Sequence, residues 1–182
     1  MQPDPRADHR DPFRRVVLVG MMGCGKTTVG RLLADRTGWP YADNDELVRR
    51  TSGREPADIR ATDGEDALHA LETRALIEAL GLPPPVVIGA AAAVVLADDA
   101  VRALRDSARV VWLRARPETL RARIGSGAGR REEAADTTWL VRQAEARESL
   151  YRAIADLIID VDDLPPDSVA GRIIDWLGSS SA

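Results

Sequence analysis

The chain has 182 residues, with 25 lysines and arginines against 29 aspartates and glutamates and a formal net charge of -4. This length suits one compact α/β domain and leaves little room for a second. The mildly acidic balance gives no overall positive field, which argues against nucleic acid or an anionic membrane surface as the main partner.

Cysteine usage and the amino-terminal sequence bear on the compartment. The single cysteine cannot form an internal disulfide, and residues 1–15 carry charges and prolines in place of an apolar signal core. The longest apolar stretch, 86–97, falls short of the roughly 20 residues needed to cross a bilayer. We therefore expect a cytoplasmic protein, with residues 1–14 as a flexible leader and 179–182 as a tail.

Short apolar segments alternate with helical patterns along the chain. Strands are predicted at 15–20, 39–42, 86–88, 110–113 and 158–161, and helices after residue 25 and at 45–50, 64–80 and 166–177. The predicted strands are apolar throughout, which is typical of a parallel sheet covered on both faces. We expect a three-layer α/β/α fold with five parallel strands, forming one domain over residues 15–178.

Residues 20–27, Gly-Met-Met-Gly-Cys-Gly-Lys-Thr, fit the phosphate-binding pattern G-x-x-x-x-G-K-[ST] between a predicted strand and helix. Glycines let such a loop point its backbone N–H groups inward, and the helix amino terminus adds partial positive charge. The pattern predicts that Lys26 neutralises the β- and γ-phosphates and that the Thr27 hydroxyl ligates Mg²⁺. Cys24 is interpreted as a small residue filling the loop, although a thiol at a helix amino terminus can also be redox-active.

Two carboxylates, Asp43 and Asp45, follow the second predicted strand and precede a helix. In a doubly wound sheet this places them at the carboxyl edge, beside the phosphate loop. Because alternate residues of an extended chain point the same way, one carboxylate could hold Mg²⁺ through its water shell while the other reaches an acceptor hydroxyl. The competing explanation is a helix cap, where aspartate and asparagine are favoured.

Together with motifs later in the chain, these residues resemble the shikimate kinase family. The later motifs are Ala-Asp-Ile-Arg-Ala-Thr-Asp-Gly-Glu at 57–65, Glu72, Arg147-x-x-Leu150-Tyr151 and Ala155-Asp156. The resemblance runs from about Val16 to Leu177. It implies a P-loop fold of the nucleoside-monophosphate-kinase kind, with a substrate-binding helical segment at about 45–80 and a lid at about 121–138. It also implies transfer of the γ-phosphoryl group of ATP, with Mg²⁺, to the 3-hydroxyl of shikimate.

The resemblance further implies roles for individual residues. Lys26 and Asp45 would be catalytic, Asp45 by holding or deprotonating the acceptor hydroxyl, while Thr27 and Asp43 would support Mg²⁺. The implied nucleotide-binding residues are Gly20, Gly23, Cys24, Gly25, Lys26, Thr27, Thr28 and Arg130. The implied acceptor-binding residues are Asp45, His69, Ala91, Ala92 and Arg147, with Arg147 at the substrate carboxylate.

The acceptor half departs from the family pattern. Leu68 and His69 stand where the family has a Phe-Arg pair, and histidine cannot offer the planar fork of the arginine that contacts the shikimate carboxylate. His69 can equally be a structural, half-buried histidine. Arg60 replaces a family phenylalanine and could restore positive charge from another direction. Residues 90–92 are alanines in place of a three-glycine turn, and alanine disfavours positive φ.

Further departures and open choices concern the lid and the nucleotide. Arg130 and Arg131 are followed by glutamates, so the lid signature Arg-Pro-Leu-Leu is absent, and Ser149 replaces a proline. Either Arg121 or Arg123 could lie near the nucleotide, or both could be solvated helix charges.

Three functions stay open on the sequence alone. The first is an ATP-dependent kinase acting on shikimate or a related hydroxylated acceptor. The second is a catalytically impaired relative that binds nucleotide in a regulatory or partner-binding role, and the third is a gluconate or antibiotic kinase of the same architecture. We expect ATP and Mg²⁺ binding, a small-molecule acceptor, a monomer, and no nucleic-acid or membrane partner.

Overall fold

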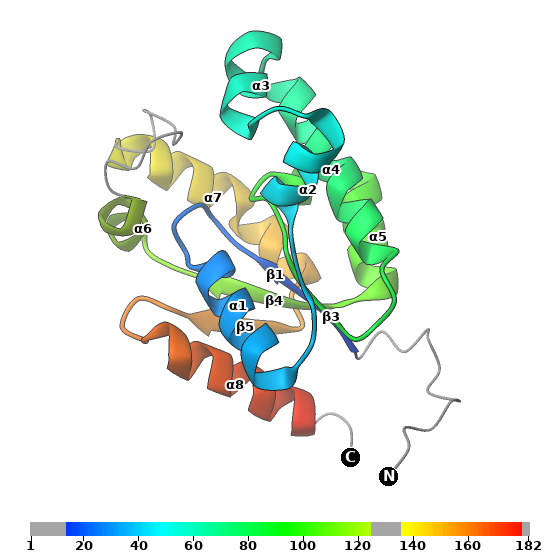
Figure 1. Ribbon diagram of the computed structural model, residues 1–182. Helices are drawn as coiled ribbons and strands as arrows, with labels where there is room; N and C mark the ends of the chain where they lie inside the picture. Colours follow the sequence, from blue (N-terminus) through cyan, green and yellow to red (C-terminus); the bar gives the residue numbers. More distant parts are fainter. Residues whose placement is uncertain (1–13, 125–135, 180–182) are drawn as a thin grey trace.

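The computed structural model describes residues 14–124 and 136–179, which form a parallel sheet between two layers of helices (Figure 1). The strands are β1 (Arg15–Val19), β2 (Tyr41–Asp43), β3 (Val86–Gly89), β4 (Arg109–Arg114) and β5 (Leu157–Asp160). Their order in the sheet is β2-β3-β1-β4-β5, and each neighbouring pair is parallel. The predicted fold class is confirmed.

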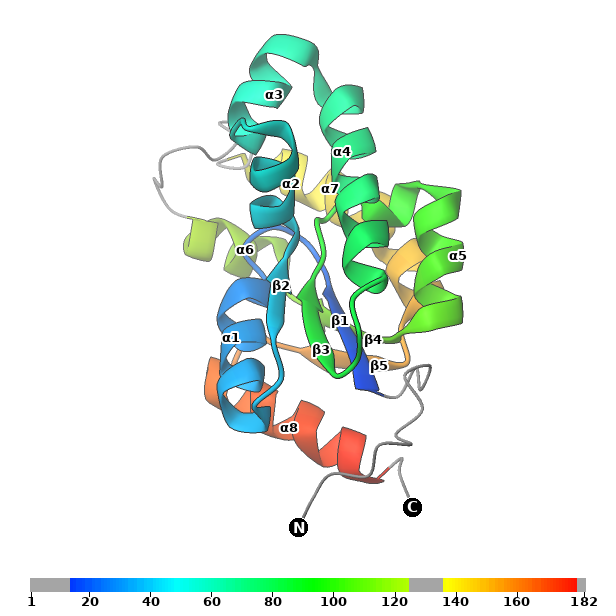
Figure 2. The same cartoon turned by 45° about the vertical axis from the view of Figure 1, so that its right-hand side comes forward.

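Helices cover both faces of the sheet (Figures 1 and 2). On one face α1 (Lys26–Thr37) packs against α8 (Pro166–Ser179), and on the other lie α4 (Glu65–Leu80), α5 (Asp98–Ser107) and α7 (Thr137–Ile154). Every residue of β1 and β3 is consequently buried. This burial explains why these strands are apolar at successive positions. Arg15 is the exception in β1, and its guanidinium donates to the carbonyl oxygens of Ser107 and Leu82.

A helical segment projects beyond the carboxyl end of the sheet (Figure 2). It consists of α2 (Asn44–Ser52), α3 (Pro56–Asp63) and the first turns of α4. The sequence pattern did not predict α3 as a separate helix, because Ile59 is its only buried residue and no apolar periodicity marks it. The remaining elements are α6 (Pro117–Ile124) and a 3₁₀ helix at Val94–Leu96.

Most predicted boundaries agree with the structure to within two residues. The prediction at 39–42 began too early, because Pro40 precedes the strand and contributes only its carbonyl oxygen, which accepts from the Val87 N–H. The expected leader at 1–14, lid at 121–138 and tail at 179–182 fall largely on residues outside the described ranges and stay predictions. In the parts of the chain that the structure describes, no helix combines the length and apolarity needed to cross a membrane.

Tyr41 packs tightly against Gly89. A methyl group added at Gly89 would lie 2.3 Å from the Tyr41 hydroxyl oxygen. We expect Gly89→Ala to lower the free energy of unfolding by about 1–3 kcal/mol, because the tyrosine must move or the strand must shift. Urea denaturation measures this, with Gly178→Ala as the control, since no heavy atom lies within 4 Å of a methyl group at that position. Equal unfolding midpoints for Gly89→Ala and wild type would contradict the prediction.

Candidate functional site

A cavity of about 610 Å³ opens at the carboxyl end of the sheet. Its walls come from the phosphate loop, the start of α2, the inner sides of α3 and α4, the turn after β3, and α7. β1 lies at the centre of the sheet, with β3 on one side and β4 on the other, so the strand order changes direction at β1. Doubly wound sheets bind their ligands in the crevice at such a point.

The phosphate loop joins β1 to α1 with a geometry that requires its glycines. Gly20, Gly23 and Gly25 have φ values of 140°, 85° and 103°, which L side chains rarely adopt. A side chain at Gly20 would also meet the carbonyl oxygen of Leu113 at 2.5 Å. The loop therefore curls at the amino terminus of α1, where backbone N–H groups and partial positive charge can hold a phosphate.

Lys26 is the only lysine in the chain. Its Nζ donates to the carbonyl oxygens of Gly20 at 2.8 Å and Met21 at 3.1 Å, and it lies 3.8 Å from Cys24 Sγ. The ammonium group therefore spans the loop from the first turn of α1. Cys24 is only 2% exposed, which agrees with its interpretation as a small residue filling the loop.

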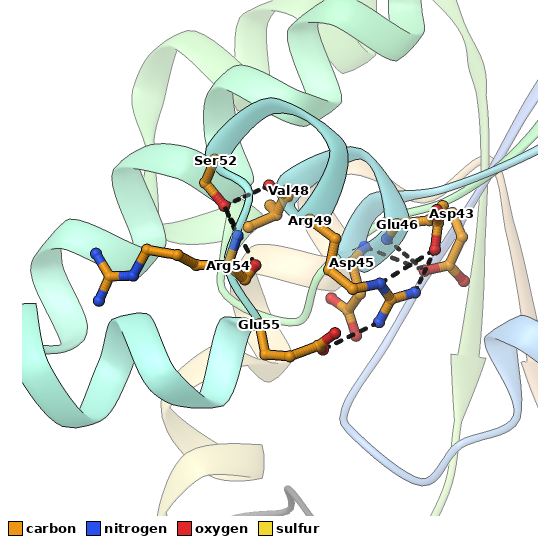
Figure 3. Close-up of polar contacts among 8 residues, drawn as sticks. All are labelled: Asp43, Asp45, Glu46, Val48, Arg49, Ser52, Arg54 and Glu55. Carbon is orange, nitrogen blue, oxygen red and sulfur yellow. Dashed lines mark hydrogen bonds and ion pairs between the residues drawn. The ribbon is translucent and has the colours of Figure 1, made fainter.

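Asp43 ends β2 and uses both oxygens of its carboxylate. Oδ1 accepts from the backbone N–H groups of Asp45 at 3.0 Å and Glu46 at 3.4 Å, which caps α2 (Figure 3). Oδ2 accepts from the Thr27 hydroxyl at 3.2 Å and the Tyr41 hydroxyl at 2.9 Å. The two explanations of Asp43 are thus compatible, because it caps a helix and also faces the phosphate loop.

Thr27 and Asp43 present two oxygen donors side by side in the cavity. Hydroxyl and carboxylate oxygens are hard ligands of the kind that Mg²⁺ prefers, and this ion is usually held by one or two protein groups together with phosphate oxygens and water. Burial and the neighbouring Asp43 raise the pKa of Tyr41, so its hydroxyl stays protonated and orients the carboxylate at neutral pH. These residues fit a magnesium ion bound together with a nucleotide.

Asp45 lies in the first turn of α2, because Asn44 already begins the helix. The expectation that Asp43 and Asp45 share an extended segment was therefore wrong, although both line the same cavity. Solvent reaches the side chain of Asp45, but the protein around it excludes part of the water, and this desolvation raises the pKa of its carboxyl group. The negative charge of Asp43 raises the pKa further, whereas the positive charge of Lys26 lowers it. A carboxylate with a raised pKa is better matched to accepting a proton from a hydroxyl.

The alanine turn after β3 forms without strained backbone. None of the described non-glycine residues has positive φ, so the turn at 90–92 does not use glycine-like torsions. Tyr151 of α7 is buried and donates its hydroxyl to the carbonyl oxygen of Ala92 at 2.7 Å. Tyr151 therefore fixes the cavity wall that contains Ala91 and Ala92, a contact that the sequence did not predict.

We expect Tyr151→Phe to loosen this wall. Loss of the hydroxyl leaves the Ala92 carbonyl oxygen without its donor, which should cost about 1 kcal/mol of folding free energy. The KM for the acceptor should rise while the KM for ATP stays unchanged, because Ala91 and Ala92 are predicted to contact the acceptor. Steady-state kinetics with each substrate varied in turn makes the comparison. An equal rise in both KM values would contradict a role confined to the acceptor.

Arg147 and His69 line the cavity together with Asp45. Arg147 is 7% exposed, and its Nη1 lies 3.9 Å from Met21 Sδ. His69 is half-buried, and its Nε2 lies 3.5 Å from a carboxylate oxygen of Glu65 one turn earlier on α4, an ion pair when the imidazole is protonated. The structure thus brings these predicted acceptor residues to one place, and it supplies His69 with an acidic neighbour on its own helix.

Most of the remaining residues predicted to bind the nucleotide lie in or beside the cavity wall. Positions 23–28 line the cavity, and Gly20 begins the loop at the end of β1. The sequence did not decide whether Arg121 or Arg123 lies near the nucleotide. Arg123 lines the cavity, whereas Arg121 does not. The Arg123 guanidinium donates to the carbonyl oxygens of Val161 at 2.6 Å and Asp162 at 3.1 Å. Arg130 lies outside the described residues.

Several cavity residues were missing from the predicted site, among them the polar or aromatic residues Asn44, Glu72 and Trp139. Asn44 stands between the two aspartates, and Glu72 follows Leu68 by four residues, which puts it on the same face of α4. Those two could have been found from spacing. Trp139 offered no such signal, because its position in the wall depends on how α7 packs.

A parallel sheet whose central strand leads through a phosphate loop into a helix, with acidic residues facing that loop, defines a P-loop protein of the class that transfers or hydrolyses the γ-phosphoryl group of a nucleotide. Residues 22–178 match the family model described as shikimate kinase. The chain belongs to the shikimate kinase family.

Individual relatives agree with this assignment. The chain is 37% identical over 172 residues to shikimate kinase of Moorella thermoacetica, covering 90% of this chain and 96% of the relative. It is 39% identical over 167 residues to shikimate kinase of Symbiobacterium thermophilum, covering 89% and 95%. The structure of shikimate kinase from Acinetobacter baumannii in complex with shikimate superposes with a TM-score of 0.85 at 26% identity, covering 91% and 93%. Family membership argues against the gluconate- or antibiotic-kinase alternative.

Proposed function

We propose that the protein is an ATP-dependent kinase that transfers the γ-phosphoryl group of ATP to a hydroxyl of shikimate or a closely related hydroxylated acceptor. The observation that carries the proposal is one cavity lined by both the phosphate loop with Lys26 and the carboxylate Asp45. Shikimate kinases 37% and 39% identical over most of the chain support the same activity.

In this proposal the phosphate loop binds the nucleotide. Backbone N–H groups at the start of α1 hold the β-phosphate, and Lys26 exchanges its contacts with Gly20 and Met21 for β- and γ-phosphate oxygens. Mg²⁺, which Thr27 and Asp43 would hold, supplies neutralisation of the phosphate charge when it is bound. Capping of α2 fixes one oxygen of Asp43 and leaves the other directed at Thr27.

Asp45 would orient the acceptor and take its proton. The acceptor hydroxyl oxygen forms a bond to the γ-phosphorus, the bond from that phosphorus to the bridging oxygen of ADP breaks, and the hydroxyl proton passes to the Asp45 carboxylate. Most of the rate enhancement in such transfers comes from positioning and charge stabilisation. Arg147, buried at the cavity wall, would contact the acceptor carboxylate.

The catalytically impaired alternative has little in its favour. Its motivation was the altered substrate turn at 90–92 and the missing lid signature. The turn lines an open cavity together with Lys26 and Asp45, and Arg130 and Arg131 of the lid lie outside the described residues. The alanine turn also forms with ordinary torsions. We therefore retain the kinase as the proposed function.

The test is ADP release by the purified protein with ATP and Mg²⁺, with and without millimolar shikimate, and with Lys26→Met as the blank. Shikimate-dependent release well above the blank supports the proposal. If ATP binds but shikimate does not stimulate release, a panel of related carboxylated and uncharged cyclic polyols decides whether the acceptor is different. No stimulation by any of them would overturn the kinase assignment. Action as a monomer in the cytoplasm stays a prediction from the sequence.

A further inference from the structure

Arg60 is an arginine without a counter-ion in the wall of the cavity. It lies on α3, is half-buried, and has no hydrogen bond or ion pair among the described residues. The neighbouring arginines differ, because Arg49, Arg50 and Arg54 each form an ion pair. Figure 3 shows the pairing of Arg49 with Glu55, just before α3 begins.

In the described part of the chain, four other basic side chains line the cavity: Lys26, His69, Arg123 and Arg147. Lys26 belongs to the phosphate loop, and Arg123 donates to two backbone carbonyl oxygens. His69 faces Glu65 on its own helix. A guanidinium that is partly withdrawn from water costs free energy unless an anion meets it. Arg147, buried on α7, likewise has no ion pair among the described residues. Arg60 and Arg147 are therefore the two described cavity cations whose charges are available to an anion of the ligand.

The position of α3 indicates which part of the ligand Arg60 can meet. α3 lies beyond the carboxyl end of the sheet with α2 and the start of α4, away from α1 (Figures 1 and 2). The proposed site for the nucleotide phosphates is the amino terminus of α1. Asp45, which is proposed to contact the acceptor hydroxyl, lies on α2, and α2 packs beside α3. An anion beside Arg60 is thus part of the acceptor and not of the nucleotide.

We propose that Arg60 is a specificity-determining residue that binds a carboxylate on the acceptor. This inference rests on the proposed function, since it assigns a group of the same acceptor. A guanidinium can bind a carboxylate through two parallel N–H···O bonds, which discriminates strongly against an uncharged substituent. Arg60 thereby supplies a permanent positive charge from α3, whereas the His69 imidazole on α4 is charged only when it is protonated.

The experiment compares wild type with Arg60→Gln, Arg60→Lys and the control Arg74→Gln, whose arginine is exposed on α4 and outside the cavity. Calorimetry measures binding of shikimate, and of an analogue in which a hydroxymethyl group replaces the carboxylate, in the presence of ADP. We expect Arg60→Gln to weaken shikimate binding at least tenfold and to leave binding of the analogue and of ADP unchanged. Arg60→Lys should recover part of the loss, and Arg74→Gln should behave as wild type.

Binding and turnover together separate the two proposals. Equal shikimate affinity for wild type and Arg60→Gln, or an equal loss for the uncharged analogue, would overturn the role of Arg60 and leave the kinase assignment intact. Binding that depends on Arg60, without ADP release stimulated by shikimate or by any acceptor of the panel, would support Arg60 and overturn the kinase assignment. Failure of wild type to bind shikimate or any acceptor of the panel would overturn both. Thermal melts of all variants verify that each is folded.

Discussion

Replacing Lys26 with methionine is expected to lower the rate of shikimate-dependent ADP formation by about 10²–10³-fold, the usual effect of removing one charge-stabilising donor from an active site. Lys26 is the only cationic side chain in the loop at 20–27. Methionine keeps most of the stem that packs along the loop, so the melting temperature should change little. Steady-state ADP release and a thermal melt measure the two effects. Turnover close to wild type would contradict the role of Lys26.

The single lysine also permits a test that needs no turnover. An amine-reactive reagent can label only Lys26 and the α-amino group of the chain. We expect ATP to slow the labelling of Lys26, because bound phosphate oxygens contact and shield its ammonium group. Labelling of the α-amino group should stay unchanged and serves as the internal control. Mass spectrometry of the two peptides measures both rates. Equal Lys26 labelling with and without ATP would place the phosphates elsewhere.

Asp45→Asn is expected to lower turnover by about 10²–10⁴-fold, the range typical of losing a general base, while ATP binding stays unchanged. Asparagine has nearly the same shape, and the backbone N–H at this position still donates to Asp43. The matched control is Asp35→Asn, an exposed position on α1 outside the cavity. Near-normal turnover for Asp45→Asn would show that another group handles the hydroxyl proton.

The raised pKa of Asp45 predicts a specific pH dependence of the reaction rate. Only the deprotonated carboxylate accepts a proton, so the acid limb of kcat/KM for the acceptor should fall at a pH above the ordinary aspartate value of about 3.9. Because the folded protein favours the protonated form, ionised Asp45 opposes folding at neutral pH. Asp45→Asn should therefore keep or raise the melting temperature while turnover is lost. A purely structural residue would lower both.

The sequence by itself determined the parts of the protein that are local in the chain. Residues 20–27 specify the phosphate loop, because its chemistry depends on glycines, a lysine and a threonine at fixed spacing between a strand and a helix. The strands that became β1, β3 and β4 were predictable because burial on both faces demands continuous apolar runs. Family motifs then indicated further residues of the cavity wall, including Asp45 and Arg147.

Only the tertiary structure decided how distant segments share the site. α3 lacks a periodic apolar face, so its existence and the aim of Arg60 into the cavity depend on packing of α3 against α4. The helical position of Asp45 follows from capping by Asp43, which spacing alone could not distinguish from extended chain. Tyr151 meets Ala92 across 59 residues of sequence. Such contacts depend on the relative placement of whole elements, whereas local motifs depend only on neighbouring torsions and side chains.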